Sequence, residues 1–222
     1  KAATNGMNFG WQGQSCGSTS RLIIHRSQYD ELSKKVVERV SQVKVGHPLD
    51  TSIKMGPVVS EAQYQKVLNY IQIAKDEGAE LLLGGNPMEI EGCPGGFFVE
   101  PTVFGNVRSN MRIAQEEVFG PIMSLMPYDD LDEAIEIANS TTYGLTAAIW
   151  TNNYFTAMEL SRSIEAGYVW VNGIGNHYRG QPYGGYKNSG IGREEGLDEM
   201  LSYTEVKSLN FAMGQADRAK NN

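Results

Sequence analysis

The chain has 222 residues, of which 41% are hydrophobic and 20% are charged, and its formal net charge is −7. These fractions of hydrophobic and charged residues are typical of globular proteins, and the length suits one large domain with an extension. The acidic excess argues against nucleic-acid binding, which needs a basic face. No stretch reaches the roughly 18 apolar residues of a membrane span. Two cysteines are too few for a disulfide scaffold, so we expect a reducing compartment and a cytoplasmic location.

Short apolar runs alternate with helical patterns from the first elements onward. Residues 21–26 form an apolar run typical of a strand. Apolar residues then recur at helical spacing, with Ser27 as the expected N-cap and Gly46 at the end of the run. A second amphipathic helix is predicted over 60–77, ending at Gly78.

The same alternation continues from Arg21 to about Asn172. The remaining predicted elements, in chain order, are a strand and turn at 79–85, a solvent loop at 86–96, a strand at 97–104 broken by Pro101, a strand at 121–128, a helix at 129–144, a strand at 146–151, a helix at 152–167 and a strand at 168–173. The strands lack strict polar alternation, as expected for a parallel sheet covered on both faces. The pattern predicts an α/β fold: a three-layer α/β/α domain with a mostly parallel sheet.

The last part of the chain has a different character. Residues 175–196 are a Gly-rich loop, 197–203 predict a short helix, and 204–211 predict a strand with no obvious partner in this chain. Because an unpaired strand exposes an edge that proteins normally cover, we expect it to pair with another domain or subunit. The expected division is a domain over 1–185 and a tail over 186–222, made of a crossing loop, a short helix, an oligomerisation strand and a frayed end.

Cys16 stands in the segment GWQGQSC, just before the first predicted strand. Cys is the best neutral-pH nucleophile among side chains, and small neighbours let backbone N–H groups approach a substrate oxygen. A lone Cys is also commonly an inert, buried packing residue. The residues alone leave both interpretations open.

The segment AQEEVFGP, at 114–121, places two carboxylates before a Phe-Gly-Pro turn. A loop carboxylate can accept hydrogen bonds from both hydroxyls of a ribose, and a neighbouring aromatic side chain can pack against a flat ring. The same residues are also typical of an acidic turn exposed to solvent. His25, His47 and His177 are widely spaced and form no metal set with the cysteines, so no metal site is expected.

Taken together, these stretches resemble the carboxyl-terminal catalytic domain of the NAD(P)-dependent aldehyde dehydrogenases. The matching segments, in order, are GQSCGSTSRL, GPVVSEAQYQKVLNYI, EEVFGP, NSTTYGLTAAIWT, AGYVWVNG and PYGGYKNSGIGREEG…YTEVKSL. They cover about Gly6 to Asn210. The resemblance implies that fold, an aldehyde substrate, NAD or NADP as cofactor without a metal, and a homo-oligomer formed through the last strand.

The resemblance also implies roles for individual residues. Cys16 matches the nucleophile that forms a thiohemiacetal and then a thioester, and its backbone N–H matches an oxyanion donor. Glu117 matches the carboxylate that binds the nicotinamide ribose, and Phe119 the aromatic near the nicotinamide. Gln63 and Lys66 match helix positions that approach the cofactor.

Substrate contacts are expected around two further segments. Gly10 and Trp11 occupy the approach to Cys16, and residues 175–183 match the family's substrate-entrance loop. The predicted substrate-binding residues are Trp11, His177, Tyr178 and Tyr183. They would line an aromatic tunnel that suits an aromatic or a cationic aldehyde, or some would be rim residues without selective effect.

The resemblance implies an amino-terminal Rossmann-type cofactor domain that this chain does not contain. With it would go the general-base Glu, the side-chain oxyanion Asn and most of the cofactor site, so we expect the isolated chain to lack hydride transfer. We also expect the tail after about Gly185 to be displaced, swapped or disordered. Two alternatives stay open: a non-catalytic assembly module, and an aldehyde dehydrogenase that transfers the acyl group to coenzyme A.

Overall fold

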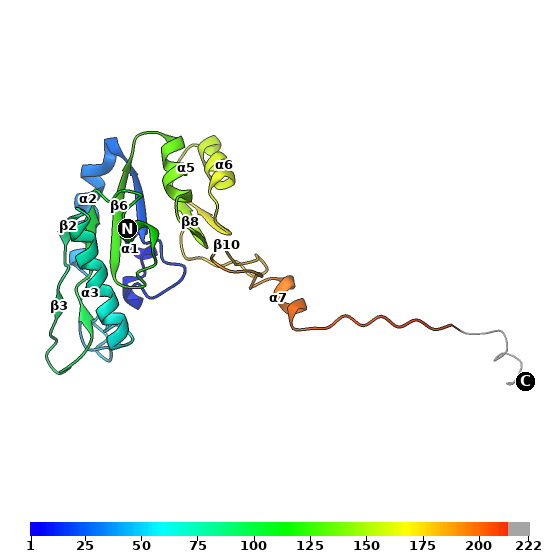
Figure 1. The fold of residues 1–222 in the computed structure, drawn as a ribbon, viewed down its shortest axis with the longest axis horizontal. Helices are drawn as coiled ribbons and strands as arrows, with labels where there is room; N and C mark the ends of the chain where they lie inside the picture. The colour runs from blue at the N-terminus through cyan, green and yellow to red at the C-terminus, as the bar shows by residue number, and fades with distance from the viewer. Residues whose placement is uncertain (213–222) are drawn as a thin grey trace, which may run out of the picture.

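The computed structural model describes residues 1–212 and has a four-stranded sheet at its centre (Figure 1). The strand order is β1 (Arg21–His25), β6 (Ile122–Tyr128), β5 (Thr102–Gly105) and β2 (Glu80–Leu83). β1, β6 and β5 run parallel to one another, and β2 is antiparallel to β5. The predicted α/β class with a mostly parallel sheet is confirmed.

Helices cover both faces of this sheet. Met123 and Leu125 of β6 belong to the core under α1 and α2, whereas Ile122 and Met126 belong to the core under α3. Successive strand residues point to opposite faces, so one apolar strand serves two cores and a three-layer arrangement results. The helices are α1 (Ala2–Gly6), α2 (Arg26–Ser41) and α3 (Glu61–Asp76).

The starts of α2 and α3 are capped by different kinds of side chain. α3 begins after Ser60, close to the predicted start of the helix, and the Ser60 side chain accepts a hydrogen bond from the N–H of Gln63 as its N-cap. α2 instead has His25 as its N-cap, and the His25 ring Nδ1 accepts the N–H of Ser27 at 3.2 Å. The predicted Ser27 cap is wrong, because the last residue of β1 itself supplies the acceptor.

The remaining strands within residues 1–212 form two-stranded pairs outside the central sheet. The pairs are β8 (Thr146–Ile149) with β9 (Tyr168–Val171), β3 (Pro87–Met88) with β4 (Phe98–Val99), and β7 (Tyr143–Gly144) with β10 (Tyr186–Lys187). The other elements are the 3₁₀ turn η1 (Phe9–Trp11) and the helices α4 (Arg112–Gln115), α5 (Leu131–Asn139) and α6 (Tyr154–Ser163). The expected break at Pro101 separates β4 from β5. Within the predicted solvent loop, β3 adds a short strand.

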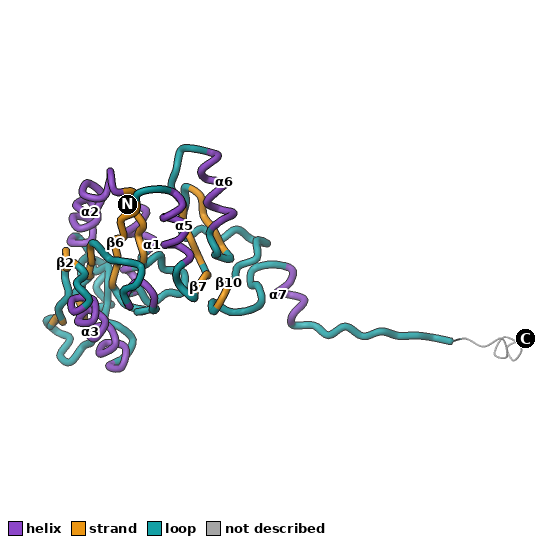
Figure 2. Tube along the Cα trace, turned by 45° about the horizontal axis from the view of Figure 1, so that its top comes forward, coloured by secondary structure: helices purple, strands orange, loops and turns teal. Residues whose placement is uncertain are grey.

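The first part of the tail is attached to the domain. β10 pairs antiparallel with β7, and the two lie side by side in Figure 2. Lys187 adds an ion pair to Glu165 at 2.5 Å and donates to the carbonyl oxygen of Asn139 at 2.7 Å. The expectation of a tail displaced from Gly185 onward is therefore wrong for Tyr186 and Lys187. Backbone pairing with β7 and the contacts of the Lys187 side chain hold these two residues against the domain.

The later part of the tail projects away from the domain. α7 (Leu197–Ser202) is followed by residues 203–212, which extend outward and are exposed (Figure 1). No strand forms over the predicted 204–211 in this structure, and its pairing with a partner stays a prediction. The predicted frayed end lies outside the described residues from residue 213 on. No helix among residues 1–212 is long and apolar enough to cross a membrane.

Candidate active site

Cys16 lies in the loop between η1 and β1, with its side chain exposed. Hydrogen bonds fix this loop to the start of the chain. The N–H of Thr19 donates to the carbonyl oxygen of Gly6 at 2.9 Å, and Asn8 Nδ2 donates to Ser18 Oγ at 3.2 Å. The exposed thiol is thus presented from a loop that is anchored just after it.

The loop after α4 is held by side chains of α3. Gln63 Nε2 donates to the carbonyl oxygens of Val118 at 3.0 Å and Phe119 at 2.7 Å, and Lys66 Nζ donates to that of Glu117 at 2.9 Å. Phe119 has a φ of +57°, a left-handed conformation that is uncommon for a residue with a side chain. Gln63 and Lys66 therefore fix the backbone of the loop that carries Glu117 and Phe119.

The two adjacent carboxylates of this loop have different surroundings. Glu116 accepts hydrogen bonds from Arg112 Nε at 2.7 Å and Nη2 at 2.8 Å, and from the Tyr70 hydroxyl. The Arg112 hydrogen bonds, followed by the one from Tyr70, lower the pKa of Glu116 to about 2. The exposed Glu117 carboxylate makes no hydrogen bond to another residue of the described chain. The Glu116 carboxylate is thus engaged by Arg112 and Tyr70, whereas the Glu117 carboxylate is available to a ligand.

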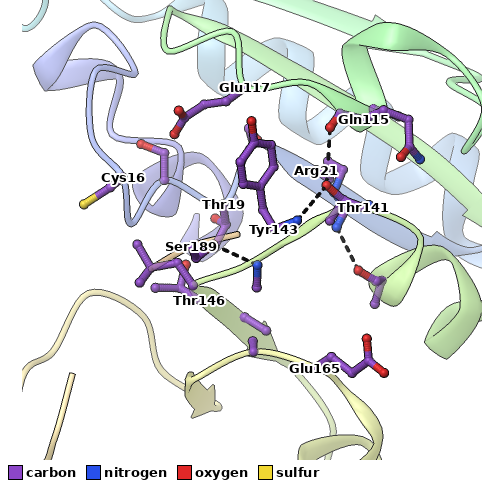
Figure 3. Close-up of a pocket in the computed structure, with 18 of the residues that line it drawn as sticks. Cys16, Thr19, Arg21, Gln115, Glu117, Thr141, Tyr143, Thr146, Glu165 and Ser189 are labelled. Atoms are coloured by element: carbon purple, nitrogen blue, oxygen red, sulfur yellow. Dashed lines mark hydrogen bonds between the residues drawn. The ribbon is translucent and has the colours of Figure 1, made fainter. Parts of the chain in front are cut away.

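Cys16 and Glu117 line the same cleft, which has a volume of about 480 Å³ (Figure 3). A smaller adjoining cleft contains both of them together with Phe119. Figure 3 shows Cys16 and Glu117 projecting from different loops. Further lining residues of the large cleft are Arg21, Thr141, Tyr143, Thr146, Glu165 and Ser189. The structure therefore brings the predicted nucleophile, ribose-binding carboxylate and aromatic to one place.

Arg21 has a structural role at the edge of this cleft. Its guanidinium donates to the carbonyl oxygens of Ile137 and Ala138, both at 2.9 Å, which satisfies the carboxyl end of α5. Burial lowers the pKa of Arg21 from its ordinary value. This explains the arginine that follows the small residues in the cysteine motif.

Two of the predicted substrate residues belong to one aromatic cluster. The rings of His177 and Tyr183 have centroids 4.8 Å apart, and Tyr168 lies 5.3 Å from Tyr183. Trp170 completes the cluster, 5.0 Å from Tyr168. The sequence analysis did not predict Tyr168 and Trp170 as members of this cluster. Their i, i+2 spacing on β9 places both side chains on one face of the strand, which could have indicated it.

The other two predicted substrate residues lie elsewhere. Tyr178 is 58% exposed and is not part of the aromatic cluster. Trp11 is 65% exposed and lines a separate cleft with Arg39 and Lys54, not the cleft of Cys16. Substrate roles for Trp11 and Tyr178 stay predictions. Among residues 1–212, His, Cys, Asp and Glu side chains form no group of three that could hold a metal ion.

Known proteins resemble this chain along nearly its whole length. Aldehyde dehydrogenase tropH of Talaromyces stipitatus is 48% identical over 220 residues, which cover 97% of this chain and 43% of the relative. Betaine aldehyde dehydrogenase of Mesorhizobium japonicum is 42% identical over 207 residues, which cover 93% of this chain and 42% of the relative.

Solved structures give the same result. An NAD⁺ complex of aldehyde dehydrogenase from Bacillus cereus superposes with a TM-score of 0.88 at 40% identity, covering 94% of this chain and 41% of that one. Indole-3-acetaldehyde dehydrogenase with NAD⁺ has a TM-score of 0.88 at 42% identity, with the same coverage. The chain thus spans about two-fifths of the length of these relatives. The family model described as "Aldehyde dehydrogenase family" matches residues 1–209, and the chain belongs to that family.

Proposed function

We propose that this chain is the catalytic-domain portion of an NAD(P)-dependent aldehyde dehydrogenase that oxidises an aldehyde to a carboxylic acid. The observation that carries the proposal is the shared cleft of Cys16 and Glu117. A nucleophile and a free carboxylate in one cleft are what this reaction needs from the domain. The NAD⁺ complexes among the solved relatives support a nicotinamide cofactor.

Cys16 performs the covalent chemistry in this proposal. Its thiolate attacks the aldehyde carbon, forming a C–S bond and a thiohemiacetal. The backbone N–H of Cys16 donates to no other described residue and can stabilise the oxyanion. The chemistry that NAD(P) supplies when bound is acceptance of the hydride from that carbon, after which Cys16 carries a thioester. Water then breaks the C–S bond, releasing the acid and restoring the thiol.

The residues present fit one end of a nicotinamide cofactor. The Glu117 carboxylate is exposed and can accept both hydroxyls of a ribose, and the partly buried Phe119 stands beside it. Because the chain spans 43% or less of its relatives, we assign the rest of the cofactor site, the general base and the side-chain oxyanion donor to a part of the protein outside this chain. The isolated chain is then inactive in hydride transfer.

The substrate and the assembly are further parts of the proposal. His177 and Tyr183 suit an aromatic or cationic aldehyde, because ring faces attract apolar rings and cations alike. Residues 203–212 carry exposed apolar side chains, with Val206 98% and Phe211 82% exposed. A segment of this kind supports strand pairing with another copy, and hence a homo-oligomer. The location proposed for the protein is the cytoplasm.

The test is formation of NADH or NADPH by the protein in its full natural length, with both cofactors and a panel of aldehydes. Cys16→Ala is expected to abolish turnover, and Cys93→Ala, which changes the other cysteine, is expected to retain it. Adding coenzyme A tests the acyl-transferring alternative, since an acyl-coenzyme A product would replace the free acid. Turnover by Cys16→Ala, or none by the unmodified protein on any aldehyde, would contradict the proposal.

A further inference from the structure

Two glutamines precede Cys16 in the segment GWQGQSC, and the backbone between them has an uncommon conformation. Gln12 has a φ of +55° and Gly13 a φ of +66°, so both residues are left-handed. The N–H of Gln14 donates to the carbonyl oxygen of Trp11 at 2.8 Å, which closes the turn. A residue with a side chain keeps a left-handed backbone only where its surroundings hold it. The turn before the nucleophile therefore needs support from elsewhere in the fold.

That support comes from residues 56–59. Gln14 Oε1 accepts the N–H of Val59, 45 residues further along the chain, at 3.0 Å. The Gln12 amide lies against the same segment, because a Cβ on Gly56 would be 3.7 Å from it. When the oxygen of this amide faces the N–H of Gly56, at 3.2 Å, both ends of the amide are satisfied. Both glutamines of the motif therefore contact one distant segment.

This segment is itself fixed to the rest of the domain. The Val58 side chain is buried, and the N–H of Val58 donates to the carbonyl oxygen of Phe97 at 2.9 Å. Ser60, the next residue after Val59, is the N-cap of α3. The N–H of Val59 is thus a donor held in place on both sides, and the side chain of Gln14 is tied to it.

We propose that Gln14 is a positioning residue for Cys16. Its amide oxygen, bonded to the N–H of Val59, holds the left-handed turn and so fixes the thiol and the backbone N–H of Cys16 in the cleft. The inference rests on the proposed function, because it concerns the nucleophile of that reaction. A displacement of about 1 Å at a reacting group can cost about a hundredfold in rate. The role requires an acceptor oxygen at this position, and a side chain of the same length without one cannot perform it.

The test compares Gln14→Met, which keeps the length of the side chain and removes the acceptor, with Gln14→Glu, which keeps an acceptor oxygen. Both changes are made in the protein of full natural length. In Gln14→Met we expect the kcat for aldehyde oxidation to fall by about tenfold. The KM for NAD(P) should stay within about twofold, because Gln63 and Lys66 hold the loop of Glu117 independently.

The conservative variant and a control separate the acceptor from the side chain as a whole. Gln14→Glu should restore most of the kcat, because its carboxylate oxygen can accept the N–H of Val59. Gln65→Met, exposed on α3, makes the same chemical change away from the nucleophile loop and should alter neither kcat nor KM. An unchanged kcat in Gln14→Met, or equal losses in Gln14→Met and Gln14→Glu, would overturn the positioning role.

Backbone hydrogen exchange gives a second readout that needs neither cofactor nor aldehyde. In Gln14→Met, exchange over residues 12–19 is expected to accelerate by about tenfold, because the turn loses its distant support. Exchange in β6 should not change, and Gln14→Glu and Gln65→Met should match the unmodified protein. Unchanged exchange over residues 12–19 in Gln14→Met would also overturn the role. Because no turnover is involved, this failure is distinct from failure of the proposed oxidation.

Discussion

Gly13 and Gly120 are in backbone contact, and this contact joins the loop of Cys16 to the loop of Glu117. A Cβ on Gly13 would lie 2.1 Å from the carbonyl oxygen of Gly120, and Gly13 has a φ of +66°. A Cβ on Gly120 would in turn lie 2.4 Å from Val67 Cγ2 on α3. The nucleophile loop thus packs on the carboxylate loop, and the carboxylate loop on α3, at distances only glycine permits.

Gly13→Ala should separate these loops. The change forces a side chain into a left-handed backbone and into the Gly120 carbonyl, and we expect a loss of about 3 kcal/mol in the free energy of unfolding. Gly92→Ala is the matched control, because Gly92 has a φ of +78° with no atom within 4 Å of an added Cβ. Its loss should be only about 1 kcal/mol. Urea unfolding measures both, and equal losses would show that the contact contributes nothing.

Glu117→Gln should weaken cofactor binding without affecting the fold. A neutral amide is a poorer acceptor for ribose hydroxyls than a carboxylate, so the KM for NAD(P) should rise by about tenfold. The thermal midpoint should not move, because the Glu117 side chain bonds to no other described residue. Glu116→Gln is the neighbouring control and should lower the thermal midpoint instead. If Glu116→Gln raised the KM for NAD(P) and Glu117→Gln lowered the thermal midpoint, the roles assigned to the two carboxylates would be wrong.

The stability that Glu116 contributes should depend on pH. Its folded-state pKa of about 2 lies below the ordinary 4.5, so the contribution is complete above pH 4.5 and is lost as the pH falls towards 2. The carboxylate side chain is 40% exposed, and solvent screening limits the contribution to about 1 kcal/mol. Unfolding of the unmodified protein and of Glu116→Gln should differ at pH 7 and converge near pH 2. A difference that is constant with pH would exclude the Arg112 pairing as its source.

Gln63→Ala should loosen the loop that carries Glu117. It removes the donor to the carbonyl oxygens of Val118 and Phe119, and the left-handed Phe119 then loses its support. We expect the KM for NAD(P) to rise severalfold and the free energy of unfolding to fall by about 1–2 kcal/mol. Gln72→Ala on the same helix removes only a surface bond to Asp76 and should change neither. Equal effects of the two changes would point to helix propensity rather than to loop support.

The sequence by itself determined the elements whose signals are local. The apolar run at 21–26 and the helix predicted over 60–77 were predictable, because strand and helix periodicity act within a few residues. The three-layer arrangement followed from the alternation of these elements. Cys16 and Glu117 were singled out because the short motifs that contain them resemble those of a known family.

Only the tertiary structure distinguished residues whose partners lie far away in the chain. Glu116 differs from Glu117 in part because the hydroxyl of Tyr70, on α3 and 46 residues away in the chain, donates to its carboxylate. The attachment of β10 to β7 and the separation of Trp11 from the cleft of Cys16 likewise depend on long-range packing. Such contacts are set by how whole layers meet, which no short window of sequence encodes.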